Sequence, residues 1–438
     1  MRFQNLQDWL RWQESLHPRA IDPGLERVSR VARRLGLDRP SGLTLTIAGT
    51  NGKGSSVAYA DSILRSAGYR TGAYTSPHLL RYNERIRING VESSDAQLLR
   101  AFHAIDQARG RITLSYFEFG TLAALYLFQE APVDIQLLEV GLGGRLDAVN
   151  LVDADVALVS SIGLDHADWL GSDLETIGRE KAGVFRADRP AVFAASAMPA
   201  SIAEVAGARG ARLCRAGEHY HWLRTADSRW EWRGPGRIVP ELPLPGIAGE
   251  VQVANAAGVI AALEQLDLPR AIDDETIRQG LREARLGGRL QRLPGTVEWL
   301  LDVAHNADSA RVLADWLLAY PPRGRRIGLI GLMRRKDPAA VLAPLYDCMD
   351  GWLLLDLQDP EAWSPETLAG LLPTGMVRGQ GDGMELLRAS EQSLGVGDQL
   401  VIFGSFRTVE QMLRARGARL PEPAADTGND PGVASAGP

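Results

Sequence analysis

The chain has 438 residues, of which 45% are hydrophobic and 23% charged, and its formal net charge at pH 7 is −6. This length allows two or three domains with sizeable cores. The negative net charge gives no support to a protein that coats nucleic acid. No apolar run is long enough to cross a bilayer, and the charged N-terminus lacks the apolar core of a secretory signal. The two cysteines, Cys214 and Cys348, show no ligand-type spacing, so we expect a cytoplasmic protein without a disulfide framework or a zinc site.

The first half of the chain alternates between strand and helix patterns. Residues 43–48 (LTLTIA) are a short apolar run rich in β-branched residues, and the segment after residue 53 places apolar side chains at helical spacing. A helix over 120–131 and strands over 133–140 and 156–162 continue the alternation. This order predicts a parallel sheet covered by helices, in which ligands collect at the carboxyl ends of the strands.

The pattern becomes looser after residue 185. A strand over 190–196 precedes a Trp- and Arg-rich stretch at 219–236, which alternates like a β meander or hairpin, and a helical stretch follows at 255–266. A segment with glycine, proline and arginine at 286–296 then leads into a fresh set of apolar strand patterns separated by helix-compatible segments. We expect a second, smaller domain there.

These patterns predict an α/β protein with two domains and a tail. The first domain, residues 1–294, is expected to contain a phosphate-binding loop and a mostly parallel sheet, and the second, residues 295–420, to be a smaller Rossmann-like α/β domain. Residues 421–438 are too poor in large apolar side chains to pack, so we expect a flexible tail.

The stretch TIAGTNGKGSS, from residue 46, resembles a phosphate-binding loop with unusual spacing. Gly49 stands only three positions before Gly52, and the hydroxyl that normally follows the lysine directly is delayed to Ser55. Glycines around Asn51 allow backbone N–H groups to face a phosphate, the next helix adds its positive end, and Lys53 supplies a mobile cation. Nucleotide binding is therefore predicted, with an ordinary glycine turn as the alternative.

Other polar groups follow the predicted strands. The stretch at 75–90 is either a long arginine-rich loop that faces anions or a solvated basic hairpin. Glu139 precedes a loop with three glycines, where a carboxylate either binds magnesium beside phosphates or caps a local turn. His166 lies between two aspartates, Asp165 and Asp168, and is either a ligand or a structural histidine. Lys181, judged by its own segment, belongs to a surface helix.

A further polar group ends the first strand of the second domain. Asp302, His305 and Asn306 occur together in the sequence LLDVAHNADSA. All three side chains are suited to hydrogen-bonding a nucleotide or a substrate, and the alternative is a polar helix cap.

Taken in order, the motifs resemble those of the folylpolyglutamate synthase and dihydrofolate synthase family, which belongs with the Mur ligases. The resemblance runs from about residue 40 to residue 412 and implies a first domain of the Mur ligase central-domain type. Any single motif is weak, but the ordered set is specific. It consists of GTNGKGS, TSPHL, NERI, YFEFGTLAAL, EVGLGGRLDAVN, GLDHADWLG, REKAG, GRLQ, DVAHN and FGSFRTVE.

This resemblance implies an ATP-dependent ligase that adds L-glutamate to 7,8-dihydropteroate, which forms dihydrofolate, and also to reduced folates. The acceptor carboxylate would attack the γ-phosphate of ATP, and the glutamate amine would displace phosphate from the resulting acyl phosphate. Such a route is physically sensible, because a carboxylate is a poor acyl donor until phosphate activates it. The family also suggests a monomer that works on small molecules only.

The resemblance further implies roles for individual residues. The ATP-binding residues would be Thr50, Asn51, Gly52, Lys53, Gly54, Ser55, Asn255, Arg289 and Asp302. The ligands of two magnesium ions would include Ser76, Glu139 and His166, with Ser76 replacing the hydroxyl missing after Lys53. The pterin would be held by Ser115, Tyr116, Phe117, Glu118, Leu146, Asp147 and Ala148. Catalysis would involve Lys53, a carbamate formed from CO₂ on Lys181, and His305 near the glutamate.

Three alternatives remain at this level. A muramyl peptide ligase shares the chemistry but is expected to carry a UDP-binding domain ahead of the loop, and only 48 residues precede Gly49. Folylpolyglutamate synthase activity alone is a narrower possibility. A non-catalytic nucleotide-binding module predicts ATP binding without phosphate release.

Overall fold

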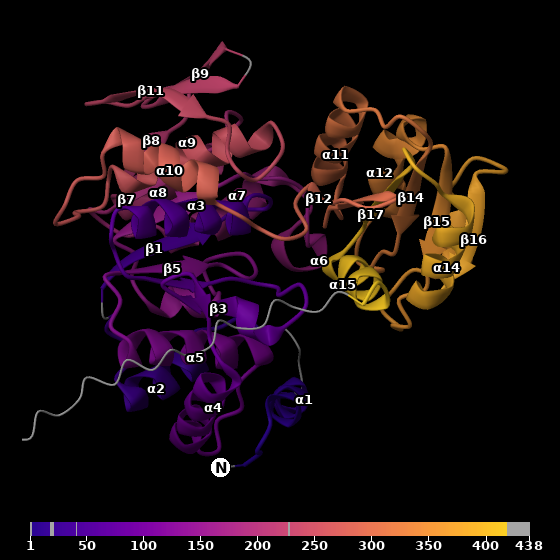
Figure 1. Cartoon of the computed structure of the whole chain (residues 1–438). Coiled ribbons are helices and arrows are strands. Elements are labelled where there is room, and N and C mark those ends of the chain that lie inside the picture. Colours follow the sequence, from indigo (N-terminus) through magenta and orange to yellow (C-terminus); the bar gives the residue numbers. More distant parts are fainter. Residues whose placement is uncertain (1, 18–21, 41, 227, 418–438) are drawn as a thin grey trace, which may run out of the picture.

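Two α/β units lie side by side in the computed structural model, which describes residues 2–17, 22–40, 42–226 and 228–417 (Figure 1). The expected tail at 421–438 lies outside the described residues. The fold class predicted from the sequence is confirmed, since both units are built on mainly parallel sheets covered by helices.

The first unit is built on an eight-stranded sheet in which β1 is central. The strand order is β4-β3-β2-β5-β1-β6-β7-β8; β3 pairs in antiparallel fashion with both β2 and β4, and the other pairs are parallel. Because β1 pairs with both β5 and β6, the carboxyl ends of these three strands are neighbours. The bounds are β1 Leu43–Ala48, β2 Thr71–Tyr74, β3 Ile86–Ile88, β4 Val91–Glu92, β5 Ile135–Glu139, β6 Val156–Val159, β7 Pro190–Phe193 and β8 Arg212–Arg215.

Helices cover both faces of this sheet (Figure 1). One face packs against α1 Leu6–Leu16, α2 Glu26–Leu35, α4 Asp95–Arg109, α5 Tyr116–Glu130 and α8 Ala200–Arg209. The other face packs against α3 Lys53–Ser66, α9 Val251–Leu263 and α10 Asp274–Glu283. Short elements connect them: η1 Tyr82–Arg85, η2 Ala148–Leu151, α6 Ala167–Leu170, α7 Leu174–Lys181 and η3 Ala182–Val184.

Helix α5 begins earlier than the sequence analysis expected. The Ser115 side chain accepts from the Glu118 backbone N–H, and the Glu118 carboxylate accepts from the Ser115 N–H, so the two residues form a capping box. This box satisfies two backbone donors that a helix otherwise leaves free. The helix therefore starts at Tyr116 rather than at residue 120, and its first turn faces the cavity described below.

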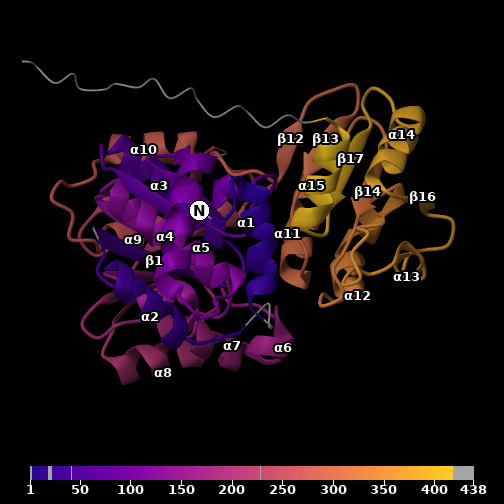
Figure 2. The same ribbon diagram turned by 90° about the horizontal axis from the view of Figure 1, so that it is seen from below.

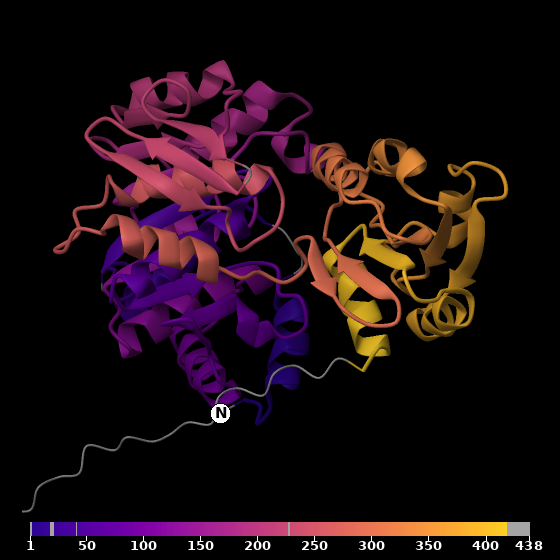
Figure 3. The same ribbon diagram turned by 45° about the horizontal axis from the view of Figure 1, so that its top comes forward.

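The Trp-rich stretch forms a three-stranded antiparallel sheet, in agreement with the predicted meander. Its strands are β9 His221–Ala226, β10 Arg229–Arg233 and β11 Ile238–Pro243. Trp230 and Trp232 are fully buried, and the Trp232 indole donates a hydrogen bond to the Ala257 carbonyl of α9 at 3.1 Å. Figure 3 shows this sheet lying over the helices of the first unit.

The second unit has a six-stranded sheet in the order β12-β13-β17-β14-β15-β16, parallel except for β12. One face packs against α11 Ala307–Ala319, α12 Pro338–Leu342, η4 Ala343–Cys348 and α13 Pro365–Ala369, and the other against α14 Gly383–Ser393 and α15 Phe406–Ala415. The strands are β12 Gln291–Leu293, β13 Glu298–Leu301, β14 Arg326–Ile330, β15 Gly351–Leu355, β16 Val377–Gly381 and β17 Gln399–Phe403. This sheet thus starts before residue 295.

Helices α11 and α15 lie on the side of the second unit that faces the first unit, as the view from below shows (Figure 2). The carboxyl ends of β13 and β14 precede α11 and α12. Across the described ranges, we find no helix that is both long and apolar enough to cross a bilayer.

Candidate active site

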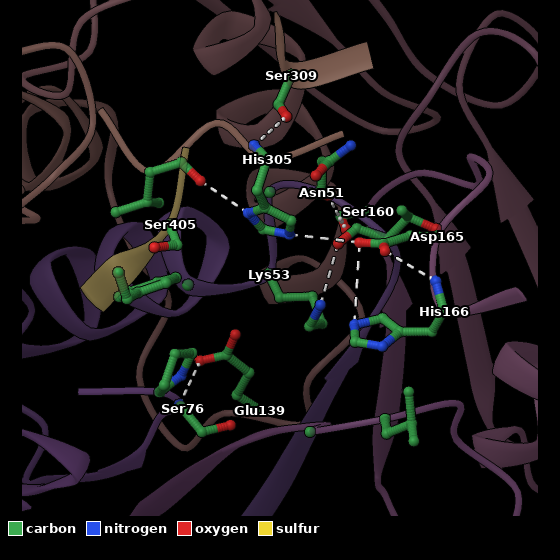
Figure 4. Close-up of a pocket in the computed structure, with 18 of the residues that line it drawn as sticks. Asn51, Lys53, Ser76, Glu139, Ser160, Asp165, His166, His305, Ser309 and Ser405 are labelled. Atoms are coloured by element: carbon green, nitrogen blue, oxygen red, sulfur yellow. Dashed lines mark hydrogen bonds and ion pairs between the residues drawn. The ribbon is translucent and has the colours of Figure 1, made fainter. Parts of the chain in front are cut away.

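A large cavity lies where the carboxyl edge of the first sheet faces the second unit. Its volume is about 1560 Å³, and it is lined by residues of both units. Every residue to which the resemblance gives a role lines this one cavity, although the residues come from segments as distant as Thr50 and His305. The close-up in Figure 4 shows part of this lining.

The phosphate loop connects β1 to α3 and contacts the residues that follow β6. Gly52 precedes the first residue of α3 with φ 90°, and a Cβ atom there would lie 2.5 Å from the Asn255 side-chain oxygen, so only glycine fits. The Ser160 hydroxyl donates to the Asn51 carbonyl at 2.6 Å, and the Thr50 hydroxyl donates to the Gly163 carbonyl at 3.1 Å. Contacts to the neighbouring strand end therefore hold the short loop.

Lys53 is folded back onto the phosphate loop. Its ammonium donates to the carbonyls of Gly49 and Thr50 at 3.0 and 3.1 Å. Burial lowers the pKa of Lys53, and the charges of Glu139 and Asp165 oppose that shift. Among the described residues, the Lys53 amine is held by these two backbone carbonyls, which an anion could replace.

Ser76 and Glu139 lie side by side (Figure 4). One Glu139 carboxylate oxygen accepts from the Ser76 backbone N–H at 3.0 Å. Burial raises the pKa of Glu139, opposed by the charge of Lys53, and no side chain of the described residues forms an ion pair with this carboxylate. A buried carboxylate with unused oxygen lone pairs, next to a hydroxyl, fits a hard divalent cation.

His166 lies apart from that pair, beside Asp165 (Figure 4). Its backbone adopts a left-handed conformation with φ 54°, and its buried Nδ1 has no hydrogen-bond partner among the described residues. Burial, followed by the charge of Lys336, lowers the pKa of His166 to about 3, so the ring is neutral. A neutral imidazole with an unused nitrogen can bind a metal ion.

The candidate metal ligands Ser76, Glu139 and His166 therefore lie around a space and do not form one tight cluster. No group of three His, Cys, Asp or Glu side chains suited to a metal occurs among the described residues. The roles of Ser76, Glu139 and His166 as magnesium ligands therefore stay a prediction.

Lys181 is buried, so the interpretation of its segment as a surface helix was wrong for this side chain. It ends α7, and its ammonium donates to the Gly49 carbonyl at 2.9 Å. Burial and then the charge of Lys53 lower the pKa of Lys181 to about 7. A neutral amine, which CO₂ needs for addition, is thus accessible near neutral pH.

The residues expected to hold the pterin form an aromatic and polar recess. The ring of Phe117 lies 5.6 Å from that of Tyr74, and a Cβ on Gly141 would come within 2.7 Å of the Phe117 ring. Asp147 accepts from the backbone of Gly141, Leu142 and Val149 at 2.8 to 3.0 Å, and burial raises its pKa to about 6. The remaining residues of the set also line the cavity: Ser115, Tyr116, Glu118, Leu146 and Ala148.

Arg289 and Asp302 reach the cavity from the junction of the two units. The Arg289 guanidinium lies 5.2 Å from the centre of the Phe406 ring. The Asp302 carboxylate accepts from the backbone of Leu290 and Ala304 at 2.9 and 2.7 Å, so it shapes the junction. A flat cation stacked on an aromatic ring beside a carboxylate can recognise a nucleotide.

The stretch at 75–90 is only partly a loop. Strands β3 and β4 form a basic hairpin, which was one of the two alternatives, and of its three arginines only Arg85 lines the cavity. The Arg85 guanidinium donates to His78 Nδ1 at 2.8 Å, which keeps that cation at the pocket wall.

Sequence reasoning missed Lys336. Its ammonium forms a buried ion pair with Asp165, although 171 positions separate the two residues. Lys336 follows the end of β14, so the rule that polar groups at strand ends form sites would have indicated it. Its contact with the first unit has no signal in the sequence.

Comparison with known proteins agrees with the architecture. Residues 288–406 match the family described as Mur ligase, glutamate ligase domain. The structure of Escherichia coli FolC in complex with DHPP and ADP superposes with a TM-score of 0.90 at 42% identity, covering 95% of this chain and 98% of that one. Fold and cavity thus define an ATP-dependent ligase of the Mur type.

Relatives that match most of the chain define a narrower class within the Mur-type ligases. The dihydrofolate synthase/folylpolyglutamate synthase of Escherichia coli (strain K12) is 43% identical over 94% of this chain and 96% of its own length. That of Mycobacterium tuberculosis is 32% identical over 87% of this chain and 82% of its own length. A bifunctional enzyme of this kind with Mn, AMPPNP and L-glutamate bound has a TM-score of 0.88 at 44% identity, covering 94% of this chain and 98% of that one. The chain belongs to the dihydrofolate synthase/folylpolyglutamate synthase family.

Proposed function

We propose that this chain joins L-glutamate to 7,8-dihydropteroate and to reduced folates, with ATP as the energy source. The observation that carries the proposal is the single cavity that joins the phosphate loop to the aromatic recess at Phe117. A pteroate bound on that ring can extend its carboxylate towards the phosphate site. The second unit closes the remaining side, where glutamate enters.

The chemistry follows from where the charges lie. The substrate carboxylate attacks the γ-phosphorus, ADP leaves, and an acyl phosphate forms. Lys53 would leave the carbonyls of Gly49 and Thr50 and bind the transferring phosphoryl group, while Arg289 holds the nucleotide. The neutral glutamate amine then adds to the acyl carbon, and the tetrahedral adduct loses a proton from nitrogen and expels phosphate to give the amide.

Divalent magnesium would be held by Ser76 and Glu139, with His166 as a ligand of a second ion. When bound, it supplies positive charge that neutralises the phosphate oxygens. The unpartnered His166 Nδ1 and the buried Glu139 carboxylate support this assignment.

Lys181 is proposed to carry a carbamate. Addition of CO₂ to its neutral amine releases a proton and leaves an anion. The pKa near 7, which burial and the charge of Lys53 cause, favours that change. The resulting anion would help to position a metal ion.

His305 is proposed to act at the glutamate side. Its Nδ1 lies 2.7 Å from the Val303 carbonyl, which orients the ring, and its Nε2 lies 3.4 Å from an Asp165 oxygen. The ring thus stands at the junction of the units, where the incoming amine meets the acyl phosphate. We further propose a monomer that acts in the cytoplasm on small molecules, without nucleic-acid or membrane partners.

Phosphate release from ATP tests this function directly. We expect glutamate-dependent release with dihydropteroate and, separately, with tetrahydrofolate. Turnover with tetrahydrofolate alone would restrict the chain to folylpolyglutamate synthesis. Binding of ATP without release in the presence of either acceptor would instead support a nucleotide-binding module, and turnover only with a different acceptor would indicate another Mur-type ligase.

A further inference from the structure

The carboxylate of Asp165 is the point at which the two units are tied together. It belongs to the loop after β6 in the first unit, and its side chain is 8% exposed. Lys336 forms an ion pair with one of its oxygens. Asn306 donates to the other oxygen at 3.2 Å, and His305 lies 3.4 Å from it. Three groups of the second unit therefore converge on one carboxylate of the first (Figure 4 shows His305 and Asp165).

These three groups come from two separate loops of the second unit. His305 and Asn306 follow β13, whereas Lys336 follows β14, and β17 lies between those two strands in the sheet. The Lys336 carbonyl accepts from the Trp363 indole at 3.0 Å, which anchors the lysine loop in its own unit. Two contacts from well-separated points fix the orientation of a rigid body better than one.

Asp165 also connects the second unit to residues of the candidate active site through hydrogen bonds. One of its oxygens accepts from the His166 backbone N–H at 2.8 Å. Asn306, which donates to Asp165, exchanges two hydrogen bonds with Asn51 of the phosphate loop, at 3.1 and 3.3 Å. The position of the second unit is thereby linked to the phosphate loop and to His166.

The charges of this pair favour the closed arrangement. The Asp165 and Lys336 side chains are each only 8% exposed, so both charges of the pair are largely removed from water. An ion removed from water is costly without its partner. A displacement of the units that breaks the ion pair is therefore energetically costly unless water reaches both charges.

We infer that Asp165 is a positioning residue that holds the second unit closed over the phosphate loop through Lys336 and Asn306. The carboxylate acts on the reaction through its neighbours and does not itself contact the substrate. This inference rests on the proposed function for its kinetic consequences, but its structural consequence is independent of any activity. Lys336 works through Asp165, so its loss should add nothing once Asp165 has been replaced.

The test compares Lys336→Met, Asp165→Asn and the double variant with the wild type. We expect each single change to lower kcat by about 100-fold, as for a misplacement of about 1 Å, with the KM for dihydropteroate nearly unchanged. The double variant should be no worse than the poorer single variant, because both changes break the same interaction. Losses that multiply in the double variant would overturn the inference.

Small-angle X-ray scattering with AMPPNP bound gives a readout that does not need catalysis. We expect a larger radius of gyration for Lys336→Met than for the wild type, and partial recovery of both compactness and kcat in Lys336→Arg. Arg311→Met is the matched control, because the exposed Arg311 side chain pairs with Asp308 of its own helix, and it should behave as the wild type. Equal radii for Lys336→Met and the wild type would overturn the inference, whereas a wild type without ligase activity would overturn only the proposed function.

Discussion

Lys53 and Lys181 donate hydrogen bonds to the same acceptor, the carbonyl oxygen of Gly49, at 3.0 and 2.9 Å. Two ammonium groups that share one oxygen repel each other, and burial adds to the cost of both charges. The repulsion is relieved if Lys53 turns towards a phosphate and Lys181 loses its charge. The geometry therefore links nucleotide binding to the ionisation of Lys181.

Replacement of Lys181 tests the carbamate. We expect Lys181→Ala to lose activity by at least about 100-fold, because no anion then stands beside the phosphate loop, and we expect small carboxylates such as formate to restore part of it. Arg179→Met is a suitable control, since Arg179 lies on the same helix but is exposed and pairs with Glu204. If Lys181→Ala keeps its activity without added bicarbonate or carboxylates, the carbamate proposal fails.

The pH dependence of the rate provides a second test of Lys181. CO₂ adds only to the neutral amine, and the pKa of Lys181 is lowered from 10.5 to about 7. The neutral fraction therefore rises as pH increases through about 7, and below that it falls about tenfold per pH unit. At a fixed concentration of dissolved CO₂, kcat should rise with pH through this range, because CO₂ needs the neutral amine and its addition releases a further proton. Lys181→Ala rescued by formate should lack this rise; a rise that persists there would assign it to another group.

Ser76 and Ser55 are two hydroxyls with different expected roles. Ser55 is buried in the first turn of α3, whereas Ser76 lies beside Glu139 and lines the cavity from another loop. We expect Ser76→Ala to raise the magnesium concentration needed for half-maximal rate by about tenfold or more. Ser55→Ala should change it by less, and the opposite order would show that the delayed hydroxyl still serves the metal.

Much of the fold could be predicted because its signals are local. The run at 43–48 and the glycines at 49 and 52 lie within ten residues, so the sequence alone indicates strand, loop and helix. The sequence also indicates the start of α5, since Ser115 and Glu118 have the spacing of a capping box. The expected start at residue 120 followed apolar spacing alone and therefore missed it.

The shape of the site could be predicted only in part. Glu139 and His166 were placed at strand ends by their own segments, but their closeness to Lys53 depends on β1 lying between β5 and β6. That order is a result of crossover connections, which no local pattern records. The ion pair of Asp165 with Lys336 is even harder to predict from the sequence, because it depends on how the two units pack against each other.

Phe117 offers a test of the pterin recess that leaves the reacting groups untouched. Its ring is partly buried against Tyr74 at the start of α5 and lines the cavity. Removal of the ring takes away one flat apolar wall, which should cost about 1 to 3 kcal/mol of binding to a bicyclic aromatic substrate. We therefore expect Phe117→Ala to raise the KM for dihydropteroate by about 10-fold to 100-fold, with the KM for ATP changed little.

The matched control for Phe117 lies on the same helix. Tyr126 is also a partly buried aromatic residue of α5, packed against the same core. Tyr126→Ala removes a ring of similar size away from the cavity, so any loss of helix stability is shared while contact with the pterin is not. Steady-state kinetics at saturating ATP and glutamate would separate the two variants. Equal KM values for dihydropteroate in both would show that the Phe117 ring supports the helix and does not contact the substrate.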